Sequence, residues 1–470
     1  MSRKFLNYSV PFVLILIVGC TTGNDYKKPA IIIPNAFKET ATNWKVAEPS
    51  SETDREDWWK VFEDRVLDEL IETGTKNNFQ LEAAVARFNA SIAFLSANNS
   101  SLYPQIGVST SSSNNSQSQA RPLRGANQPN IFDSNQVSMV ASYELDLWGR
   151  ARSAIDSASA LSEAAFQDTQ SLKLLIRSEI AVTYFSILGL DTQISLLDKS
   201  ILAYKKQANI VRLRFEEGIV SGADFYRVQT IVENELLRIQ SLHSKRSILE
   251  HSLALLIGRN ASDFSLASGN VFNVHNPSVP STLPSQLLER RPDIASSERK
   301  VAATNSDIGV AQAAFFPTIG LSAQAGFQND STSRLISVPN QFWSIGPAAF
   351  LTVFDAGRRD AIVSQAKSKN AEAIAIYKNT VIIAIKEVED ILVDLKNRES
   401  SQININNSLR YSDKNYSIAI ERYNEGVSSY LEIVDAFIQK SQSQLASADQ
   451  STQLLIGRVN LIKALGGIWH

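Results

Sequence analysis

Apolar side chains recur at alternating steps of three and four residues along two very long stretches of the chain, residues 149–217 and 357–425. Each stretch is 69 residues long, contains no proline, and ends in a related motif, Arg-Phe-Glu-Glu-Gly in the first and Arg-Tyr-Asn-Glu-Gly in the second. A 3-4 step held over five or more turns is typical of a coiled-coil seam. At 1.5 Å per residue, each helix would measure about 100 Å, so we expect an elongated molecule.

The seam of the first stretch is apolar except at one threonine. Its positions are Ile176, Ile180, Thr183, Ile187, Leu190, Ile194, Leu197, Ile201, Tyr204, Ala208, Val211 and Phe215.

Four shorter segments show strict alternation of apolar and polar residues instead, which is the period of a strand with one apolar face. These segments lie near 106–110, 136–146, 319–327 and 343–353. The edge of a soluble sandwich would show the same alternation. If the segments are membrane strands instead, four of them cannot close a barrel, for which about eight are needed. In lipid an open sheet leaves backbone groups unpaired, so we expect an oligomer. Two copies would give eight strands, and three would give twelve and room for a pore.

The order of elements repeats along the chain. Residues 316–322 match residues 103–109 at an offset of 213, and the glycines that end the two long stretches, Gly218 and Gly426, are 208 apart. We therefore expect a duplicated unit of helix, β-hairpin, very long helix, turn and long helix. The expected organisation is a signal peptide (1–19), an N-terminal arm and equatorial region (20–76), a first repeat (77–258), an inter-repeat connection (259–291) and a second repeat (292–470).

The amino terminus has the pattern of an export signal. Arg3 and Lys4 precede an apolar segment, residues 10–18, that is too short to span a bilayer. The segment leads to Cys20, the single cysteine of the chain, in a sequence that resembles a bacterial lipobox. We expect lipid attachment at Cys20 and sorting to the outer membrane, since threonine and not aspartate follows the cysteine. An ordinary signal peptide with an incidental cysteine is the alternative.

Composition and motifs argue against several classes of function. The formal net charge is −2 and no basic block occurs, so no nucleic-acid partner is expected. The four histidines are not clustered with carboxylates, and no phosphate-binding glycine loop is present. We therefore expect no enzyme, no catalytic or metal site, and no cofactor.

Four motifs carry a family resemblance: Tyr-Glu-Leu-Asp-Leu-Trp-Gly-Arg at 143–150, Leu-Glu-Arg-Arg-Pro-Asp-Ile at 288–294, Phe-Asp-Ala-Gly-Arg-Arg at 354–359 and Ala-Leu-Gly-Gly at 464–467. The chain resembles the TolC/OprM-type outer membrane efflux proteins, in particular their lipoprotein branch. The resemblance implies an α+β membrane protein, a homotrimer with a twelve-stranded barrel in outer membrane lipids and a tunnel of long helices in the periplasm.

The resemblance also implies a function. It is that of the outer membrane channel of a tripartite efflux system, a passive exit duct for small molecules that works with a periplasmic adaptor (membrane fusion) protein and an inner membrane transporter of the RND type or similar. The outer membrane duct of a type I polypeptide secretion system is the alternative. A rigid spacer would have no need of alternating strands.

The turns that end the long helices are the candidate site. Gly218 and Gly426 suit the left-handed residue that closes a helix. Ser221 with Asp224, and Ser429 with Glu432, fit the capping box that opens the next one. These residues could be helix caps alone.

By resemblance, Asp224 and Tyr423 lie where the family locks its closed aperture through a hydrogen bond, and Glu432 and Asp435 lie where it places a ring of carboxylates. Ser428 stands where TolC has an arginine in its lock, so the lock here would be weaker or differently connected.

Other motifs have structural interpretations. The segment Arg290–Asp293 predicts a helix start, with Pro292 in the first turn. Gly149-Arg150 and Gly357-Arg358 are expected to turn strand into helix. Two interpretations stay open for three aromatic residues, an interfacial belt or the filling of the strand–helix junction: Trp148, Phe342 and Trp343.

Overall fold

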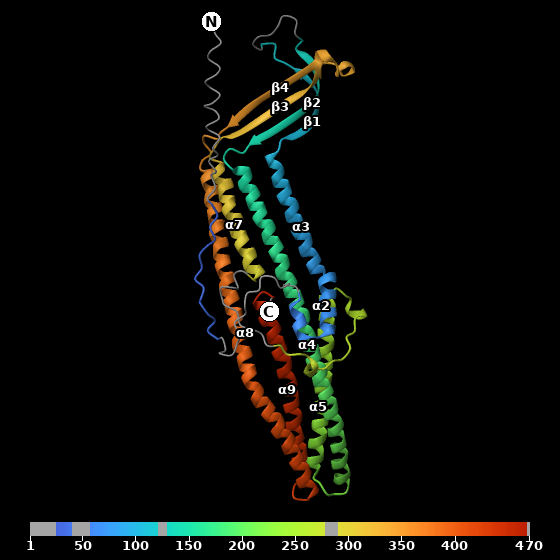
Figure 1. The fold of residues 1–470 in the computed structure, drawn as a ribbon. Coiled ribbons are helices and arrows are strands. Elements are labelled where there is room, and N and C mark those ends of the chain that lie inside the picture. The colour runs from blue at the N-terminus through green and yellow to red at the C-terminus, as the bar shows by residue number, and fades with distance from the viewer. Residues whose placement is uncertain (1–24, 40–56, 121–128, 278–289, 468–470) are drawn as a thin grey trace. The chain divides into compact units, whose positions relative to one another are not determined.

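The computed structural model describes residues 25–39, 57–120, 129–277 and 290–467 (Figure 1). Contacts divide the chain into two units. Unit 1 comprises residues 1–30, 87–165 and 296–377, and unit 2 comprises residues 31–86, 166–295 and 378–470. Each unit therefore takes segments from both sequence repeats.

Unit 1 contains a four-stranded antiparallel sheet in the order β1-β2-β3-β4 (Figure 1). The strands are β1 (Gln105–Ser116), β2 (Ile131–Leu145), β3 (Thr318–Asn329) and β4 (Gln341–Phe350). In register, Val108 lies opposite Met139, Met139 opposite Ala325, and Ala325 opposite Trp343, so the apolar sets of all four strands share one face. The four predicted strands are confirmed. The polar sequence of residues 111–116 predicts a loop, but in the structure this segment continues β1.

Helices precede β1 and β3 and follow β2 and β4. In unit 1 these are the end of α3 (Phe79–Asn99), most of α7 (Pro292–Ala313), and the first parts of α4 (Arg150–Glu216) and α8 (Arg358–Asn424). The two long helices have 67 residues each, close to the predicted 69-residue stretches.

An aspartate caps each long helix at its strand–helix corner. The Asp146 carboxylate accepts the backbone N–H groups of Ala151 and Arg152 at 2.9 and 3.0 Å. At the second corner, Asp355 accepts from the backbone of Gly357 and Arg359. The corner glycines have positive φ, +79° at Gly149 and +85° at Gly357, as expected for residues that reverse the chain. The sequence analysis identified these glycines and missed the aspartates.

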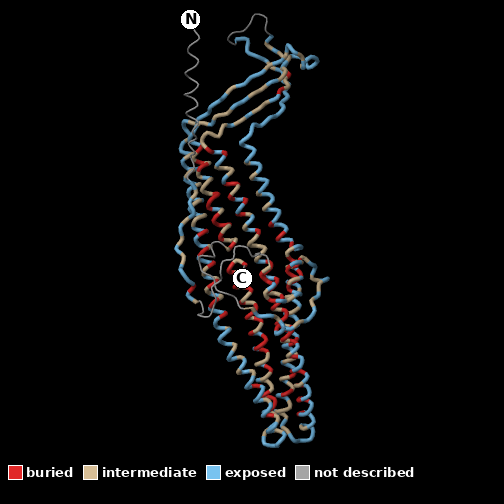
Figure 2. The backbone as a smooth tube through the Cα atoms, viewed as in Figure 1, coloured by how far each residue is buried: buried red, intermediate tan, exposed pale blue. Residues whose placement is uncertain are grey.

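Unit 2 packs the seam of the long helices. Nine of the twelve seam positions of α4 are buried, from Ile176 to Val211. The main core of this unit joins α4 to α2 (Arg65–Asn77), α5 (Gly222–Leu256) and α9 (Tyr430–Ala464), and Phe62 and Phe185 meet in it at 5.0 Å. Figure 2 shows the buried positions along these helices. The predicted coiled-coil seam is confirmed.

The apolar pattern from Trp58 to about Gly74 predicts a single helix, which the structure shows to be interrupted. A 3-10 turn, η2 (Trp58–Phe62), ends at Glu63 in the left-handed region, φ +51°. Asp64 then starts α2 by accepting the backbone N–H groups of Val66 and Leu67. The prediction failed because a continuous apolar pattern does not reveal a local capping aspartate.

Arg291 confirms the structural interpretation of its motif. Its buried guanidinium pairs with Asp293 and Glu387 at 2.7 Å and donates to the carbonyl of Ala464 at the end of α9. The next turn brings Gly466 so close to the carbonyl of Arg290 that a Cβ would lie 2.8 Å from it. Two of the sequence motifs, 288–294 and 464–467, therefore contact each other.

Helices α4 and α9 pack tightly where Gly189 faces Thr452. A Cβ on Gly189 would lie 2.7 Å from Thr452 Cγ2, well inside van der Waals contact. We expect Gly189→Ala to destabilise the protein by about 1–3 kcal/mol through overpacking, despite the better helix propensity of alanine. Thermal unfolding in detergent should show a lower Tm. Adding Thr452→Ala should recover it, and an unchanged Tm for the single variant would contradict this packing.

Candidate functional site: the helical hairpin tips

Two helical hairpins of unit 2 end in nearly identical turns. Gly218 and Gly426 adopt φ values of +74° and +75°. After each glycine the next N–H bonds back over the turn, from Ile219 to the carbonyl of Arg214 at 2.8 Å and from Val427 to that of Arg422 at 3.0 Å. This pattern is the Schellman motif that closes a helix with a left-handed residue. Both glycines therefore have the left-handed conformation that closes a helix.

The two helix starts that follow differ. Ser221 Oγ accepts the backbone N–H of Asp224 at 3.2 Å and donates to the Asp224 carboxylate at 2.8 Å, so the first predicted cap is formed. Ser429 occupies the N-cap of α9 but makes no side-chain cap bond. The capping box predicted for Ser429 and Glu432 is therefore absent, because Glu432 turns to an arginine instead.

Both predicted aperture carboxylates have a basic partner. Glu432 Oε1 lies 3.3 Å from Arg422 Nε, which is on the preceding helix of the same hairpin. Asp435 Oδ1 accepts from Arg227 Nη2 at 2.9 Å, which joins the second hairpin to the first. All four side chains are about half exposed. Within one chain, these carboxylates are therefore neutralised and not left as free negative charges.

Tyr423 contacts the first hairpin through its ring. The Arg214 guanidinium lies 5.0 Å from the ring centroid, and Tyr430 meets the ring edge-on at 5.3 Å. Burial, with Tyr423 nearby, raises the pKa of Tyr430 to about 12. The hydroxyl of Tyr423 is buried and has no hydrogen-bond partner among the described residues. The predicted bond to Asp224 is thus not formed within one chain, and a bond to another chain would require the side chain to rotate.

An apolar cluster lies beside these polar contacts. It combines Tyr204, Ala208 and Val211 of α4 with Val228 and Val232 of α5, and Val434 of α9 joins it from the second hairpin. Phe437 meets Tyr204 edge-on at 4.9 Å. Among the described residues, the hairpins of one chain are therefore held together by apolar packing, the Arg214–Tyr423 ring–cation contact, the Arg227–Asp435 ion pair and a buried hydrogen bond between Ser200 and Ser441 at 3.0 Å.

Arg214 and Arg227 are the tip residues that the sequence analysis missed. The repeat offset of 208 could have identified them, because it places Arg227 opposite Asp435 and Arg214 opposite Arg422. The two hairpins thus carry opposite charges at one equivalent position, and the structure pairs those two side chains.

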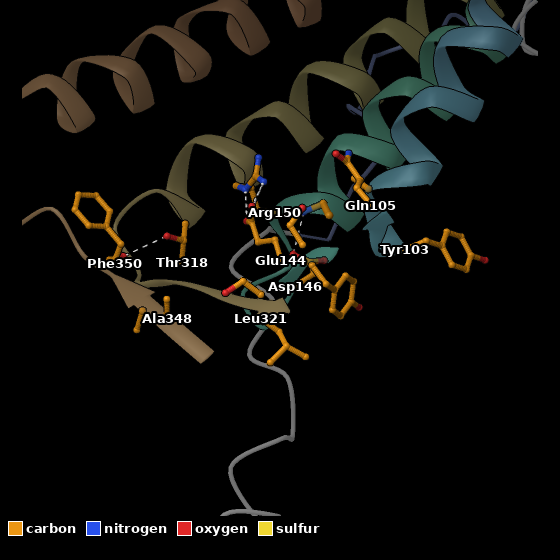
Figure 3. A pocket seen from close by; sticks show the side chains of 16 residues that line it. Tyr103, Gln105, Glu144, Asp146, Arg150, Thr318, Leu321, Ala348 and Phe350 are labelled. Atoms are coloured by element: carbon orange, nitrogen blue, oxygen red, sulfur yellow. Dashed lines mark hydrogen bonds and ion pairs between the residues drawn. The ribbon is translucent and has the colours of Figure 1, made fainter. Parts of the chain in front are cut away.

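A hollow lies in unit 1, where the sheet meets the helices (Figure 3). It has a volume of about 570 Å³, and Tyr103, Gln105 and Leu321 are among its lining residues. Arg150 is one of its lining residues and donates to the Glu144 carboxylate from Nε and Nη2, at 2.8 to 3.0 Å (Figure 3). The charged side chains among the lining residues are also paired, Glu144 with Arg150 and Asp146 with Arg152.

Among the predicted aromatic residues, Trp148 fills the strand–helix junction. It stacks on Phe316 at 4.8 Å and donates to the carbonyl of Pro317 at 2.7 Å. Trp343 lies on the apolar face of the sheet and is 77% exposed. In the part of the chain that the structure describes, no group of three or more His, Cys, Asp or Glu side chains could hold a metal ion.

Comparison with known proteins identifies the fold. The model of the outer membrane efflux protein family matches residues 70–259 and 283–467. The chain belongs to the outer membrane efflux protein family. Outer membrane protein OprJ of Pseudomonas aeruginosa is 27% identical over 475 residues, covering 100% of this chain and 97% of OprJ. The antibiotic efflux pump outer membrane protein ArpC of Pseudomonas putida is 28% identical over 490 residues, covering 100% of this chain and 96% of ArpC.

A solved structure shows the same architecture. The Campylobacter jejuni CmeC outer membrane channel superposes with a TM-score of 0.88 at 26% identity, covering 95% of each chain. The protein is therefore an outer membrane efflux channel and not an enzyme. The predicted fold, family and function are confirmed at this level.

The pair Arg227–Asp435 can be tested by exchanging its charges. We expect Arg227→Asp and Asp435→Arg each to raise channel conductance and sensitivity to large antibiotics, because like charges would then face each other across the hairpins. A half-exposed pair is worth about 0.2–1 kcal/mol, so the state in which the two hairpin tips are apart should become up to about five-fold more populated. The double exchange should restore the parent conductance.

The matched control is the exposed pair Arg212–Glu216 within α4, at 2.7 Å. Exchanging its charges should leave conductance unchanged. A double exchange of Arg227 and Asp435 that conducts like either single variant would show that the pair does not hold the hairpins together.

Proposed function

We propose that three copies of this chain form a twelve-stranded barrel in the outer membrane and a helical tunnel beneath it, which together serve as the exit duct of a tripartite pump for small molecules. The observation that carries this proposal is the sheet of unit 1. One of its faces is apolar and exposed, with Val108 76%, Trp343 77% and Ile345 62% exposed. Figure 2 shows few buried positions on the strands. An exposed apolar surface of this extent requires a partner or a lipid phase.

The apolar face has the height of a bilayer. On β2 its apolar members run from Val137 to Leu145, a span of nine residues. Membrane strands need about 9–11 residues. Beyond Val137 the same face becomes polar, since Asn135 lies opposite Ser112 and Asn329 in register. This face of the sheet therefore changes from apolar, which suits lipid, to polar, which suits water, between the row of Val137 and the row of Asn135.

The opposite face suits an aqueous lumen. Ser138 accepts hydrogen bonds from Gln324 at 2.9 Å and Gln136 at 3.3 Å on this side. The alternation of an apolar outer face with a polar inner face is typical of a membrane barrel.

Strand pairing requires more than one chain. β1 and β4 each pair on one edge only within the described residues. In lipid each unpaired backbone group costs several kcal/mol, so the edges must meet those of other copies. Three copies supply twelve strands, which is wide enough for a lumen, whereas eight strands leave an interior that side chains fill.

The relatives support the role in efflux. ArpC is named as the outer membrane protein of an antibiotic efflux pump, and this chain aligns with 96% of its length. We infer that this protein likewise works with a periplasmic adaptor and an inner membrane transporter of the RND type or similar. The lipid anchor at Cys20 lies outside the described residues and is supported by the lipobox pattern. Diacylation with an N-acyl chain would anchor the protein stably.

The tips are then the inner aperture of the tunnel. Asp224, Tyr423, Glu432 and Asp435 all lie on the ends of the hairpins, within about one or two helical turns of Gly218 or Gly426. In a trimer their copies would approach a common axis.

The assembly can be tested with purified protein. We expect native mass spectrometry in detergent to give a trimer, and planar bilayers to show conductance steps that grow when the tip is opened by mutation. A well-folded monomer in detergent would contradict the barrel. A trimer without conductance in any tip variant would favour a rigid spacer.

The lock between chains has its own test. If the Tyr423 hydroxyl rotates to the Asp224 carboxylate of another chain, the bond contributes about 1.5–3 kcal/mol per copy. Tyr423→Phe combined with Asp224→Ala should then raise conductance and sensitise cells to vancomycin. Ser221→Ala, which removes only the cap partner of Asp224, is the control. Parent-like conductance of the double variant would leave these residues with structural roles alone.

A further inference from the structure

Small residues keep the hollow of Figure 3 open on the inner face of the sheet. Glu144 lies opposite Gly320 in register, and Gly320 lies opposite Ala348, so across β2, β3 and β4 this row carries one long side chain. A Cβ on Gly320 would meet only the carbonyl oxygen of Tyr143, at 3.8 Å, which is ordinary van der Waals contact. Gly320 is not among the glycines of positive φ, so its backbone does not require glycine. The hollow therefore exists because the side chains of this row are small.

Two exposed aromatic residues line the hollow from opposite edges of the sheet (Figure 3). Tyr103 precedes β1 and is 68% exposed, and Phe350 ends β4 and is 70% exposed. β1 and β4 are three strand spacings apart, or about 14 Å. The volume of about 570 Å³ falls within the range of sites that hold small organic molecules, about 300–1,000 Å³. The hollow thus has the size of a small-molecule site and offers an aromatic ring at each end.

The charged side chains of the hollow are already satisfied by one another. Asp146 accepts two backbone N–H groups and the Nε of Arg152. Arg150 uses Nε and Nη2 for Glu144, and its Nη1 has no hydrogen-bond partner among the described residues. The carboxylate oxygens of Glu144 can still accept further bonds. The Arg150–Glu144 pair therefore offers a donor and an acceptor side by side without a net charge.

The other polar lining residues of the sheet are uncharged. Gln105 lies opposite Ser142 in register, and Ser142 lies opposite Ser322, so an amide and two hydroxyls form the next row of the inner face. A carboxamide, which donates and accepts at the same time, matches these groups. An ionic group would have to compete with the existing Arg150–Glu144 pair for one of its members. The lining therefore favours uncharged molecules.

We propose that this hollow binds uncharged amphipathic molecules that combine aromatic rings with an amide-type group, as a station for such cargo on the wall of the duct. The inference rests on the proposed function, in which the inner face of the sheet lines the lumen. It adds a binding site to the duct and names the class of molecule that the site takes.

The exposure of the hollow suits a station that cargo leaves again. The side chains of Arg150 and Glu144 are each 44% exposed, so water competes for their free donor and acceptor positions. The aromatic rings at the two ends are also open to solvent. A conducting pathway needs sites that attract its cargo and still release it.

Filling the hollow tests its role in binding. We expect the full-length protein in lipid nanodiscs to bind indomethacin amide, an uncharged molecule with two aromatic groups, in equilibrium dialysis against empty nanodiscs. Gly320→Leu should weaken this binding about ten-fold, because the new side chain occupies the hollow. Phe350→Ala, at an exposed position, should weaken it as well through the lost stacking surface.

Gly107→Leu is the matched control. Gly107 lies on the same inner face, one row beyond Gln105 and Ser142, and a Cβ there would meet nothing within 4 Å. This variant narrows the lumen to the same extent outside the hollow and should bind like the parent. Equal binding by Gly320→Leu, Phe350→Ala and Gly107→Leu would overturn the site.

The class of ligand is tested with a matched pair of probes. Indomethacin has the same skeleton as its amide but carries a carboxylate, and the parent should bind it at least about five-fold more weakly. Glu144→Gln removes the partner of Arg150 and leaves its charge in the hollow, so this preference should shift towards the carboxylate. A parent that binds both probes equally, or an unchanged preference in Glu144→Gln, would overturn the assignment to uncharged molecules.

Conductance separates this inference from the proposed function. In planar bilayers, indomethacin amide should reduce the current of the parent and of Gly107→Leu, and affect Gly320→Leu at least about five-fold less at the same concentration. A conducting parent that binds no amide would overturn the station and leave the duct in place. A parent that binds the amide but never conducts would remove the duct, and with it the role of the hollow as a station.

Discussion

The unpaired edges of a four-stranded sheet are the constraint on which this structure depends. The backbone groups of β1 and β4 that have no partner within the described chain could be tolerated in water, but the apolar face of the same sheet favours lipid. When copies of the chain pair edge to edge, the backbone groups of β1 and β4 gain partners and the apolar face can stay in lipid. The short corners at Gly149 and Gly357 then start the long helices directly beneath the strands, so closing the sheet also gathers the helices.

The duplication preserves what geometry requires and lets charge diverge. Both strand–helix corners keep an aspartate cap and a glycine of positive φ, and both tips keep the Schellman turn, because no other residue types satisfy these backbones so readily. At the tips the side chains differ. Asp224 serves the local cap, whereas its counterpart Glu432 pairs with Arg422. Two unlike hairpins in one chain allow pairing by opposite charge, as Arg227 and Asp435 show.

Periodicity predicted the parts of the fold that depend on repeated burial. The steps of three and four residues gave the long helices to within a few residues, and the alternation gave four strands with a common apolar face, as Val108, Met139, Ala325 and Trp343 confirm. It did not predict the break at Glu63 or the pairing of the tip carboxylates. Those features depend on single side chains that compete for one partner, and a pattern averaged over many residues carries no information about such choices.

If the proposed duct is closed at rest and opened by a partner, its tip should be held by contacts that are individually weak. The tip has this character. Its ion pairs are half exposed and worth about 0.2–1 kcal/mol each, and the Tyr423 hydroxyl is buried without a partner among the described residues, which costs about 1–3 kcal/mol. The apolar contacts of Tyr204 and Val434 supply most of the remaining cohesion. A partner that offers Tyr423 a hydrogen bond and competes for the arginines would therefore shift the tip towards separation without breaking any strong interaction.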